Sequence, residues 1–186
     1  MPSFPELRQP LDDGSVKVRP GAERDIPEVL IAYQDDPELY RRLGELRAPS
    51  GAELGRRAEN AEADRIAGRN LTMTIVEGEE DTCRGQISVH HVDWENGRAE
   101  LGVWVAPGWR GRGLARRSLA MVGGWLLGEG GLERVQVATE PDNGRMIAAA
   151  RGAGFTFEGV LRANRLERGG RVDEAVLSLV RWDLRT

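Results

Sequence analysis

The stretch RAELGVWVAPGWRGRGLARRSLAMVGGW, from Arg98 to Trp125, decides the fold of this chain. Its first part, from Ala99 to Val105, is short, apolar and rich enough in β-branched residues to predict a strand. Its last part carries apolar residues at helical spacing: Leu114, Met121, Val122, Trp125 and Leu126. Between the predicted strand and the predicted helix lies a turn rich in glycine, PGWRGRG, at residues 107–113.

This strand, turn and helix start are together suited to hold a phosphate group. The first N–H groups of a helix have no partner within the helix, and the helix dipole favours negative charge there. Gly111 and Gly113 have no Cβ, so a ligand can approach their backbone closely. The turn is also rich in guanidinium groups, which bind phosphate through paired hydrogen bonds: Arg110, Arg112, Arg116 and Arg117.

The side chains of the turn exclude two nucleotide-binding motifs. A P-loop carries lysine and then serine or threonine after its second glycine, where this chain has Leu114 and Ala115. A dinucleotide-binding fingerprint needs a third glycine, and Arg116 stands at that position.

The turn resembles the acyl-CoA loop of the GNAT family of N-acetyltransferases, whose pattern is Arg/Gln-x-x-Gly-x-Gly/Ala. The matching residues are Arg110-Gly111-Arg112-Gly113-Leu114-Ala115. The order of elements is similar over about the C-terminal half, with a second strand VQVAT at 135–139 and a helix that opens at Asn143 and closes at Gly154-Phe155. The segment GFTFEGVLR, 154–162, is similar to the RimJ/RimL subgroup, which includes ribosomal-protein alanine acetyltransferases.

The resemblance implies an α+β protein with the GNAT fold. This fold has a mixed, mostly antiparallel central sheet of about seven strands, helices on both faces, and a V-shaped splay between the fourth and fifth strands. The pattern of residues predicts strands at Val16–Arg19, Leu71–Glu77, Cys83–Val92, Ala99–Val105, Arg134–Thr139, Thr156–Asn164 and Val172–Asp183. It predicts helices at Ala22–Gln34, 37–46, 50–67, Leu114–Gly128 and Asn143–Gly152. We expect an N-terminal arm at 1–14 and a single domain at 15–186.

The resemblance also implies acetyl-CoA as the co-substrate. The pantetheine arm would lie along Val103, Trp104 and Val105, and the pyrophosphate would lie on Arg110 through Ala115. Asn143 would reach the cofactor from the next helix, although asparagine is equally a favoured N-cap there. Gly102, isolated within a strand, marks a bulge or a close approach of a ligand to the backbone, and in the family this strand is bulged.

Acetyl transfer to an amine requires a group that removes a proton from the ammonium form. Glu100 matches the position where many family members place such a carboxylate, and it is our first candidate. His90 and His91 are the second. Because consecutive strand residues face opposite ways, we expect at most one histidine to face the cleft.

Three positions depart from the pattern of the family. Ala150 stands where many members have a tyrosine that protonates the departing thiolate, and Met146 stands where RimL-like enzymes often have serine. Arg165 stands where relatives use a carboxylate. The first two departures favour slow turnover, or proton transfer by another residue, and Arg165 weakens the case for a ribosomal-protein substrate.

The composition limits the remaining possibilities. The chain has 186 residues, 40% hydrophobic content and a net charge of −4, with no apolar run of membrane-spanning length and no apparent signal peptide, so we expect a cytoplasmic protein. The single cysteine, Cys83, predicts no internal disulfide. The charge balance predicts no nucleic-acid partner, and two adjacent histidines with one cysteine predict no metal site.

The predicted function is direct acetyl transfer from acetyl-CoA to an amine. A protein N-terminus is the first expectation for the acceptor, and a small amine, such as an aminoglycoside or peptide antibiotic, is the second. A non-catalytic acyl-CoA-binding sensor is a third interpretation, motivated by Ala150 and Met146. The C-terminal hairpin could pair with a second subunit in a homodimer.

Overall fold

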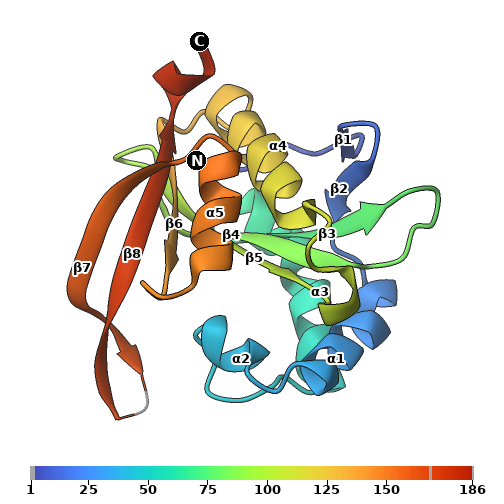
Figure 1. Cartoon of the computed structure of the whole chain (residues 1–186). Coiled ribbons are helices and arrows are strands. Elements are labelled where there is room, and N and C mark those ends of the chain that lie inside the picture. The colour runs from blue at the N-terminus through green and yellow to red at the C-terminus, as the bar shows by residue number, and fades with distance from the viewer. Residues whose placement is uncertain (1–2, 168, 186) are drawn as a thin grey trace.

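The computed structural model describes residues 3–167 and 169–185. Within these residues one mostly antiparallel sheet has eight strands in the order β1-β2-β3-β4-β5-β6-β8-β7 (Figure 1). The strands are β1 (Leu11–Asp12), β2 (Val16–Pro20), β3 (Leu71–Glu77), β4 (Gly85–Asp93), β5 (Arg98–Val105), β6 (Arg134–Thr139), β7 (Thr156–Glu167) and β8 (Gly170–Val180). The α+β GNAT architecture is confirmed, and the strand beyond the expected seven is the short β1.

Helices cover both faces of the sheet, as predicted (Figure 1). They are α1 (Ile26–Asp35), α2 (Leu39–Arg42), α3 (Gly51–Ile66), α4 (Leu114–Gly128) and α5 (Gly144–Gly152), with 3-10 turns η1 (Glu23–Asp25), η2 (Pro107–Trp109) and η3 (Arg181–Arg185). The predicted helix 37–46 is only the single turn α2, because Gly44, at φ +73°, takes a left-handed conformation that ends it. The predicted last strand stops at Val180, where η3 begins.

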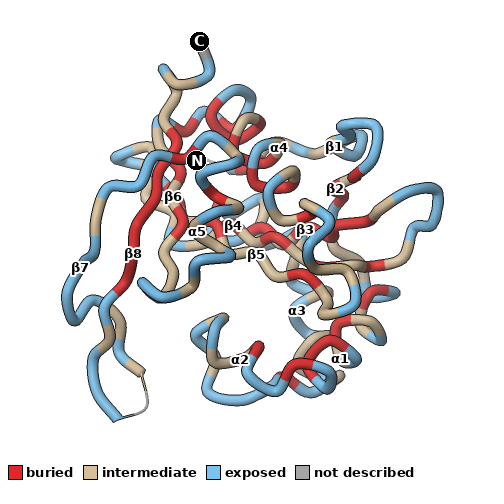
Figure 2. The backbone as a smooth tube through the Cα atoms, viewed as in Figure 1, coloured by how far each residue is buried: buried red, intermediate tan, exposed pale blue. Residues whose placement is uncertain are grey.

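The main core lies between the sheet and α4. One face of α4 is fully buried through Leu119, Val122 and Leu126, and burying each such side chain contributes about 1.5–3 kcal/mol. The N-terminal arm joins this core through Phe4, which is also fully buried. Figure 2 shows β8 buried along most of its length while β7, at the edge of the sheet, is largely exposed.

The predicted splay lies between β5 and β6. These two strands are the only parallel neighbours among the described residues, and they pair only from Arg98–Glu100 to Arg134–Gln136. Beyond Glu100, β5 keeps its antiparallel partner β4 while β6 diverges toward β8. The strands therefore open into a V whose vertex is at Glu100 and Gln136.

The bulge expected at Gly102 is in the neighbouring strand. Gly102 pairs regularly with Ser88, whereas the register of β4 and β5 shifts between His90 and Asp93. Two residues of β4 there oppose Ala99 alone, and His91 takes a positive φ of 48°. The prediction of a bulge in β5 is therefore wrong, and the bulge in β4 reorients the histidines.

Candidate functional site

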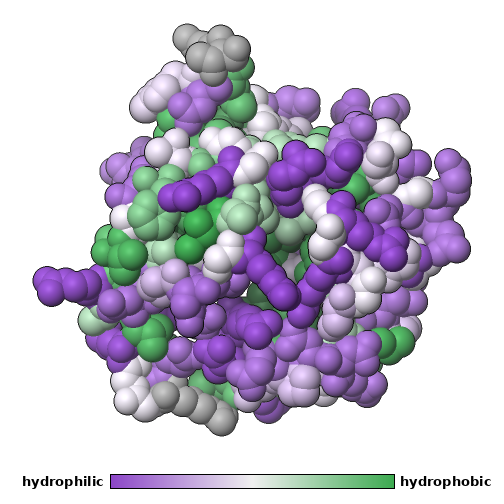
Figure 3. Space-filling model, in the orientation of Figure 1, coloured by the Kyte–Doolittle hydropathy of each residue, from purple (hydrophilic) through white to green (hydrophobic). Residues whose placement is uncertain are grey.

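A cavity of about 660 Å³ opens at the splay, and hydrophilic residues surround the hollow on this face (Figure 3). Its β4–β5 wall includes Gln86, Ser88, His90, His91, Glu100, Gly102 and Trp104. Its helical wall includes Tyr33, Arg42, Glu45, Leu54, Arg57 and Asp64. Its third wall, from β6 through β8, includes Thr139, Glu140, Asn143, Arg165 and Glu174.

The three residues predicted for proton transfer converge on one side of this cavity. His90 Nε2 lies 3.3 Å from one carboxylate oxygen of Glu100, and His91 Nδ1 lies 3.7 Å from the other. The expectation that only one histidine faces the cleft is wrong, because the β4 bulge breaks the alternation of side chains. The Glu100 side chain is 19% exposed, whereas that of His91 is 77% exposed.

Gly102 makes room for this arrangement. A Cβ at this position would lie 3.1 Å from both His90 Cε1 and Ser88 Oγ, which is tighter than an ordinary van der Waals contact. Ser88 Oγ in turn lies 3.4 Å from His90 Nδ1. The isolated strand glycine therefore marks a close approach, and the approaching groups are the side chains of β4.

Two opposing effects act on the pKa of Glu100. Burial alone raises it, but hydrogen bonds from His90 and Gln136, together with nearby imidazole charge, hold the pKa below its usual value. The Gln136 Nε2 donates to Glu100 Oε2 over 3.1 Å. The carboxylate is therefore ionised at neutral pH and attracts a cation.

The same three side chains bear on the expectation that no metal binds. Their ligand atoms lie within 4.8 Å of one another, which is close enough to hold a metal ion. The spacing of these residues in the sequence did not predict this cluster. Each carboxylate oxygen already has a nitrogen neighbour, from His90 on one side and Gln136 on the other.

The glycine turn has the conformation that its sequence predicts. Gly111 and Gly113 have φ values of +81° and +84°, which favour glycine, and Gly113 is the N-cap of α4. A Cβ at Gly111 would meet open space. The N–H groups at the start of α4 lack intrahelical partners, so the turn can receive an anionic group.

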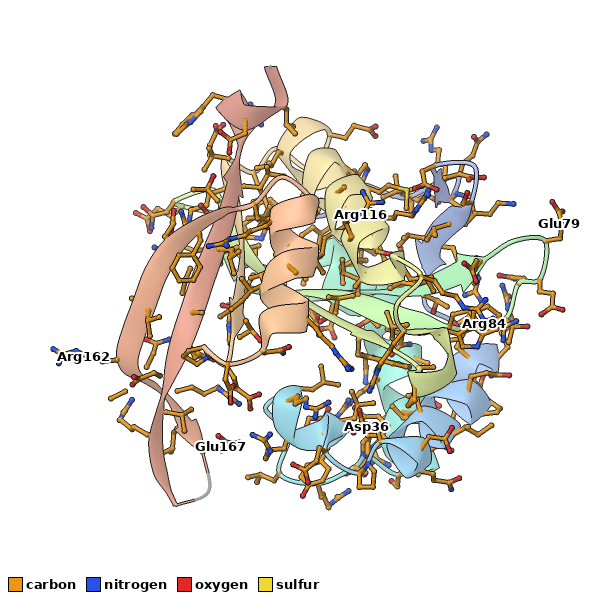
Figure 4. The ribbon with its side chains drawn as sticks, in the orientation of Figure 1. Asp36, Glu79, Arg84, Arg116, Arg162 and Glu167 are labelled. Atoms are coloured by element: carbon orange, nitrogen blue, oxygen red, sulfur yellow. The ribbon has the colours of Figure 1, made fainter. Side chains whose placement is uncertain are left out.

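The arginines of the turn differ in what they contact. Arg110 donates to Asp36 over 2.5 Å and to the Val105 carbonyl over 2.9 Å, so it links the turn to neighbouring segments. Arg112 stacks on Trp109 and pairs with Glu77. The more distant Arg117 pairs with Asp13 and Arg116 lies on α4 near the turn (Figure 4).

The other predicted cofactor residues lie around the same opening. Val103, Trp104 and Val105 follow the last residue of β5 that pairs with β6, so they flank the splay. Asn143 is the N-cap of α5, accepting from the Met146 N–H, while its amide donates to Thr139 Oγ1 over 3.0 Å. This position is compatible with both roles considered for Asn143, which are capping α5 and reaching the cofactor.

The structure shows what surrounds each of the three residues that depart from the family pattern. Ala150 is fully buried against the core, so its side chain supplies only packing. Met146 packs partly buried against the same core. Arg165 lies on the cavity wall amid Glu140, Glu167 and Glu174, with its Nε 3.0 Å from Glu174.

Sequence reasoning missed several residues that line the cavity or support its walls. Gln136 was not singled out, because a glutamine in a strand carries no motif. Tyr33 was placed on a helix face, but its hydroxyl lies 3.3 Å from Glu45 on the cavity wall, and burial raises its pKa. Arg41 joins α2 to Glu140 and Glu167, residues distant in sequence, so only the fold reveals this link.

Comparison with known proteins shows the family. The model of the acetyltransferase (GNAT) domain matches residues 16–156. The chain is 24% identical over 154 residues to the uncharacterized N-acetyltransferase p20 of Bacillus licheniformis, with 83% of this chain and 86% of that protein covered.

Solved structures share the fold at low sequence identity. The RimL ribosomal L7/L12 alpha-N-protein acetyltransferase in complex with coenzyme A superposes with a TM-score of 0.79 at 17% identity, covering 92% of this chain and 98% of that chain. The microcin C7 self immunity acetyltransferase MccE, in complex with acetyl-CoA and AMP, gives 0.79 at 21% identity, covering 91% and 94%. No helix among residues 3–167 and 169–185 is long and apolar enough to span a membrane. On the family match, this chain belongs to the GNAT family of acetyltransferases.

Proposed function

We propose that this acyltransferase is an acetyl-CoA-dependent N-acetyltransferase that acetylates a primary amine directly, without an acyl-enzyme. The observation that carries the proposal is the convergence of His90 and Glu100 at the vertex of the splay, beside the open edge of β5. Of the residues predicted to bind the cofactor, Trp104 and Asn143 line the same cavity as His90 and Glu100.

We assign the acyl-CoA to the glycine turn and the free edge of β5. Gly111, Gly113 and the N-terminus of α4 would hold the pyrophosphate, and Val103 and Trp104 would flank the pantetheine arm. The Val105 carbonyl already accepts from Arg110, so we assign it to shaping the turn. When bound, acetyl-CoA supplies the acetyl group as an activated thioester.

Glu100 removes the proton from the acceptor. The ionised carboxylate attracts the cationic amine into the cavity and receives its proton, directly or through water, while His90, 3.3 Å away, holds the carboxylate in place. His91, whose side chain is 77% exposed, lies 3.7 Å from the other carboxylate oxygen.

The departing thiolate needs little help. A free thiol has a pKa of about 8.5, so a CoA thiolate leaves without a strong acid. Ala150 therefore does not prevent transfer, and water or a cavity hydroxyl such as that of Thr139 can supply the proton.

For the acceptor we propose a protein N-terminus first and a small amine second. The structural likeness to an L7/L12 alpha-N-protein acetyltransferase supports the first. The cavity volume of about 660 Å³ is typical of small-molecule sites, which supports the second, as does the likeness to a self immunity acetyltransferase.

The proposal is tested by measuring thiol release from acetyl-CoA with N-terminal peptides, polyamines, and aminoglycoside or peptide antibiotics, with acetyl-CoA affinity measured by calorimetry. Glu100→Gln should lower kcat/KM about 100-fold, the size of a general acid–base contribution. Glu95→Gln, at an exposed carboxylate of the adjacent turn, is the matched control and should change little.

Three outcomes are informative. Thiol release with one class of acceptor supports transfer and identifies the substrate. Tight acetyl-CoA binding with no release for any acceptor supports the sensor interpretation and contradicts transfer. Absence of acetyl-CoA binding contradicts the assignment of the turn.

A further inference from the structure

Glu100 is held from the side opposite His90 by a chain of hydrogen bonds. Glu100 and Gln136 are the last register partners of β5 and β6 before the strands diverge, and Gln136 Nε2 donates to Glu100 Oε2 over 3.1 Å. The Gln136 Oε1 accepts from Arg134 Nη2, also over 3.1 Å. Two further hydrogen bonds of 2.6 Å join Arg134 to Glu158 of β7.

These hydrogen bonds determine which way the Gln136 amide faces. A guanidinium has only donors, so the group it contacts on Gln136 must be the carbonyl oxygen. The amide NH₂ is then left for Glu100, which as a carboxylate has only acceptors. Arg134 cannot rotate away at no cost, because Glu158 holds both of its terminal nitrogens and itself accepts from Ser178 Oγ over 2.6 Å.

We propose that Gln136 is a positioning residue for the candidate proton-transfer carboxylate Glu100, and that the Arg134–Glu158 ion pair sets its orientation. The inference rests on the proposed function. By occupying Oε2, Gln136 directs Oε1 toward His90, 3.3 Å away. It also stabilises the ionised form of Glu100, which burial alone would disfavour.

Other charged or titratable groups face the same cavity, and they are the same in all variants proposed below. From β4 they are His90 and His91. From the helical side they are Asp25, Tyr33, Arg42, Glu45, Arg57 and Asp64. From β6 through β8 they are Glu140, Arg165 and Glu174. A change confined to Gln136 therefore reports on the Glu100 contact.

Two substitutions of Gln136 test the inference. Gln136→Leu removes the donor at similar volume, and kcat/KM at neutral pH should fall about ten-fold or more, the effect of one hydrogen bond to a charged group. Gln136→Glu places a second carboxylate beside the first, and the two resist ionising together. The acidic limb of the kcat/KM profile should therefore move to higher pH in the order wild type, Gln136→Leu, Gln136→Glu.

Substitutions of two matched arginines distinguish an effect on the position of Gln136 from an effect on general stability. Arg98 and Arg134 are register partners on adjacent strands, and each pairs with a carboxylate, Asp93 or Glu158. Only Arg134 contacts Gln136. Arg134→Leu should lower kcat/KM in the direction of Gln136→Leu, whereas Arg98→Leu should leave both activity and the pH profile unchanged.

The double variant Glu100→Gln/Gln136→Leu identifies which proposal fails. If positioning is correct, Gln136→Leu has little further effect once Glu100 is replaced. An equal loss with and without Glu100, or a loss with no movement of the acidic limb, would overturn the inference. If Glu100→Gln alone leaves activity intact, the proposed role of Glu100 fails instead. Thermal unfolding of each variant identifies any that do not fold.

Discussion

Arg110 and Asp36 join the glycine turn to the end of α1 across 74 residues of sequence. Arg110 Nη2 lies 2.5 Å from Asp36 Oδ2, and the same oxygen lies 3.3 Å from Arg42 of α2. Burial raises the pKa of Asp36, but the two arginines and the Glu38 N–H lower it overall, so this carboxylate is ionised at neutral pH. Figure 4 shows Asp36 between α1 and α2, facing the turn.

Asp36→Asn should therefore weaken acetyl-CoA binding, although Asp36 lies outside the turn. Arg110 would lose its charged partner, and the turn would sample other conformations before binding. We expect acetyl-CoA affinity to fall about five-fold, roughly 1 kcal/mol, at the low end for a charged hydrogen bond because Arg110 is partly exposed. Calorimetry measures this value directly.

Arg42→Gln is the control for this prediction. It removes the other arginine at Asp36 but leaves the contact of Asp36 with the turn. Acetyl-CoA affinity should remain within two-fold of wild type, on the order of 0.4 kcal/mol. An equal loss in both variants would show that the turn does not depend on Arg110 and Asp36 specifically.

Gly102→Ala should impair turnover more than stability. The new Cβ would press on the His90 ring and on Ser88 Oγ, both at 3.1 Å, and would displace His90 from Glu100. We expect kcat to fall about ten-fold, with a cost to the free energy of unfolding of about 1 kcal/mol, the low end for overpacking. Steady-state kinetics and denaturant unfolding separate the two effects.

The matched control is Gly124→Ala within α4, where a Cβ would meet nothing within 4 Å. Alanine is the better helix former, so this variant should gain about 0.5–1 kcal/mol with unchanged kcat. Normal turnover in Gly102→Ala would show that the position of His90 is unimportant to the reaction.

Arg41→Gln should act on the acceptor and not on acetyl-CoA. Arg41 of α2 pairs with Glu140, on the cavity wall, and over 3.1 Å with Glu167 of β7, which is labelled in Figure 4. Without it, α2 and the β7–β8 hairpin can separate. We expect the KM for the acceptor to rise several-fold while the acetyl-CoA affinity stays constant.

Arg162→Gln provides the control for Arg41. Arg162 lies on the same strand as Glu167 but points away from the molecule (Figure 4). The substitution Arg162→Gln should leave the KM for the acceptor unchanged. A rise in KM of equal size in both variants would mean that net charge, and not the link between α2 and β7, governs acceptor binding.

The features that could be predicted from the sequence are those formed by residues close together in it. The helix α4 follows its glycine turn directly, and the Ser50 N-cap of α3 is recognisable from Glu53 three residues later, which completes a capping box. The splay followed from the family resemblance, because a parallel pair that opens after three residues has no local pattern.

The site was less predictable because it depends on one inserted residue and on distant contacts. The bulge at His91 puts both histidines beside Glu100, and no residue type at this place in the sequence predicts a bulge. The positions of Gln136 and Asp36 depend on strand register and on a 74-residue separation respectively. Motifs identify residue types that chemistry needs, whereas the fold decides which of them meet.

A buried ion pair between β2 and η1 gives the stability a predictable dependence on pH. The side chains of Arg19 and Asp25 are 9% and 3% exposed, and they form hydrogen bonds of 2.7 and 2.9 Å. Burial raises the pKa of Asp25, but Arg19, Thr74 and the Ala22 N–H lower it overall below the model-compound value of 3.8. Because the folded state holds the proton less tightly than the unfolded chain, the contribution of Asp25 is complete above about pH 4 and is lost as the pH falls through the lowered pKa.

Asp25→Asn should therefore destabilise the protein at pH 7 by about 3–5 kcal/mol, because Arg19 keeps a buried charge without its main partner. The difference from wild type should shrink as the pH falls below 4, since the wild-type carboxylate is then being protonated. Urea unfolding at several pH values measures both effects. Asp12→Asn, at an exposed pair with Lys17, should change stability by less than about 1 kcal/mol at every pH. A difference between Asp25→Asn and wild type that stays constant down to pH 3 would show that packing, and not the charge of Asp25, stabilises this part of the fold.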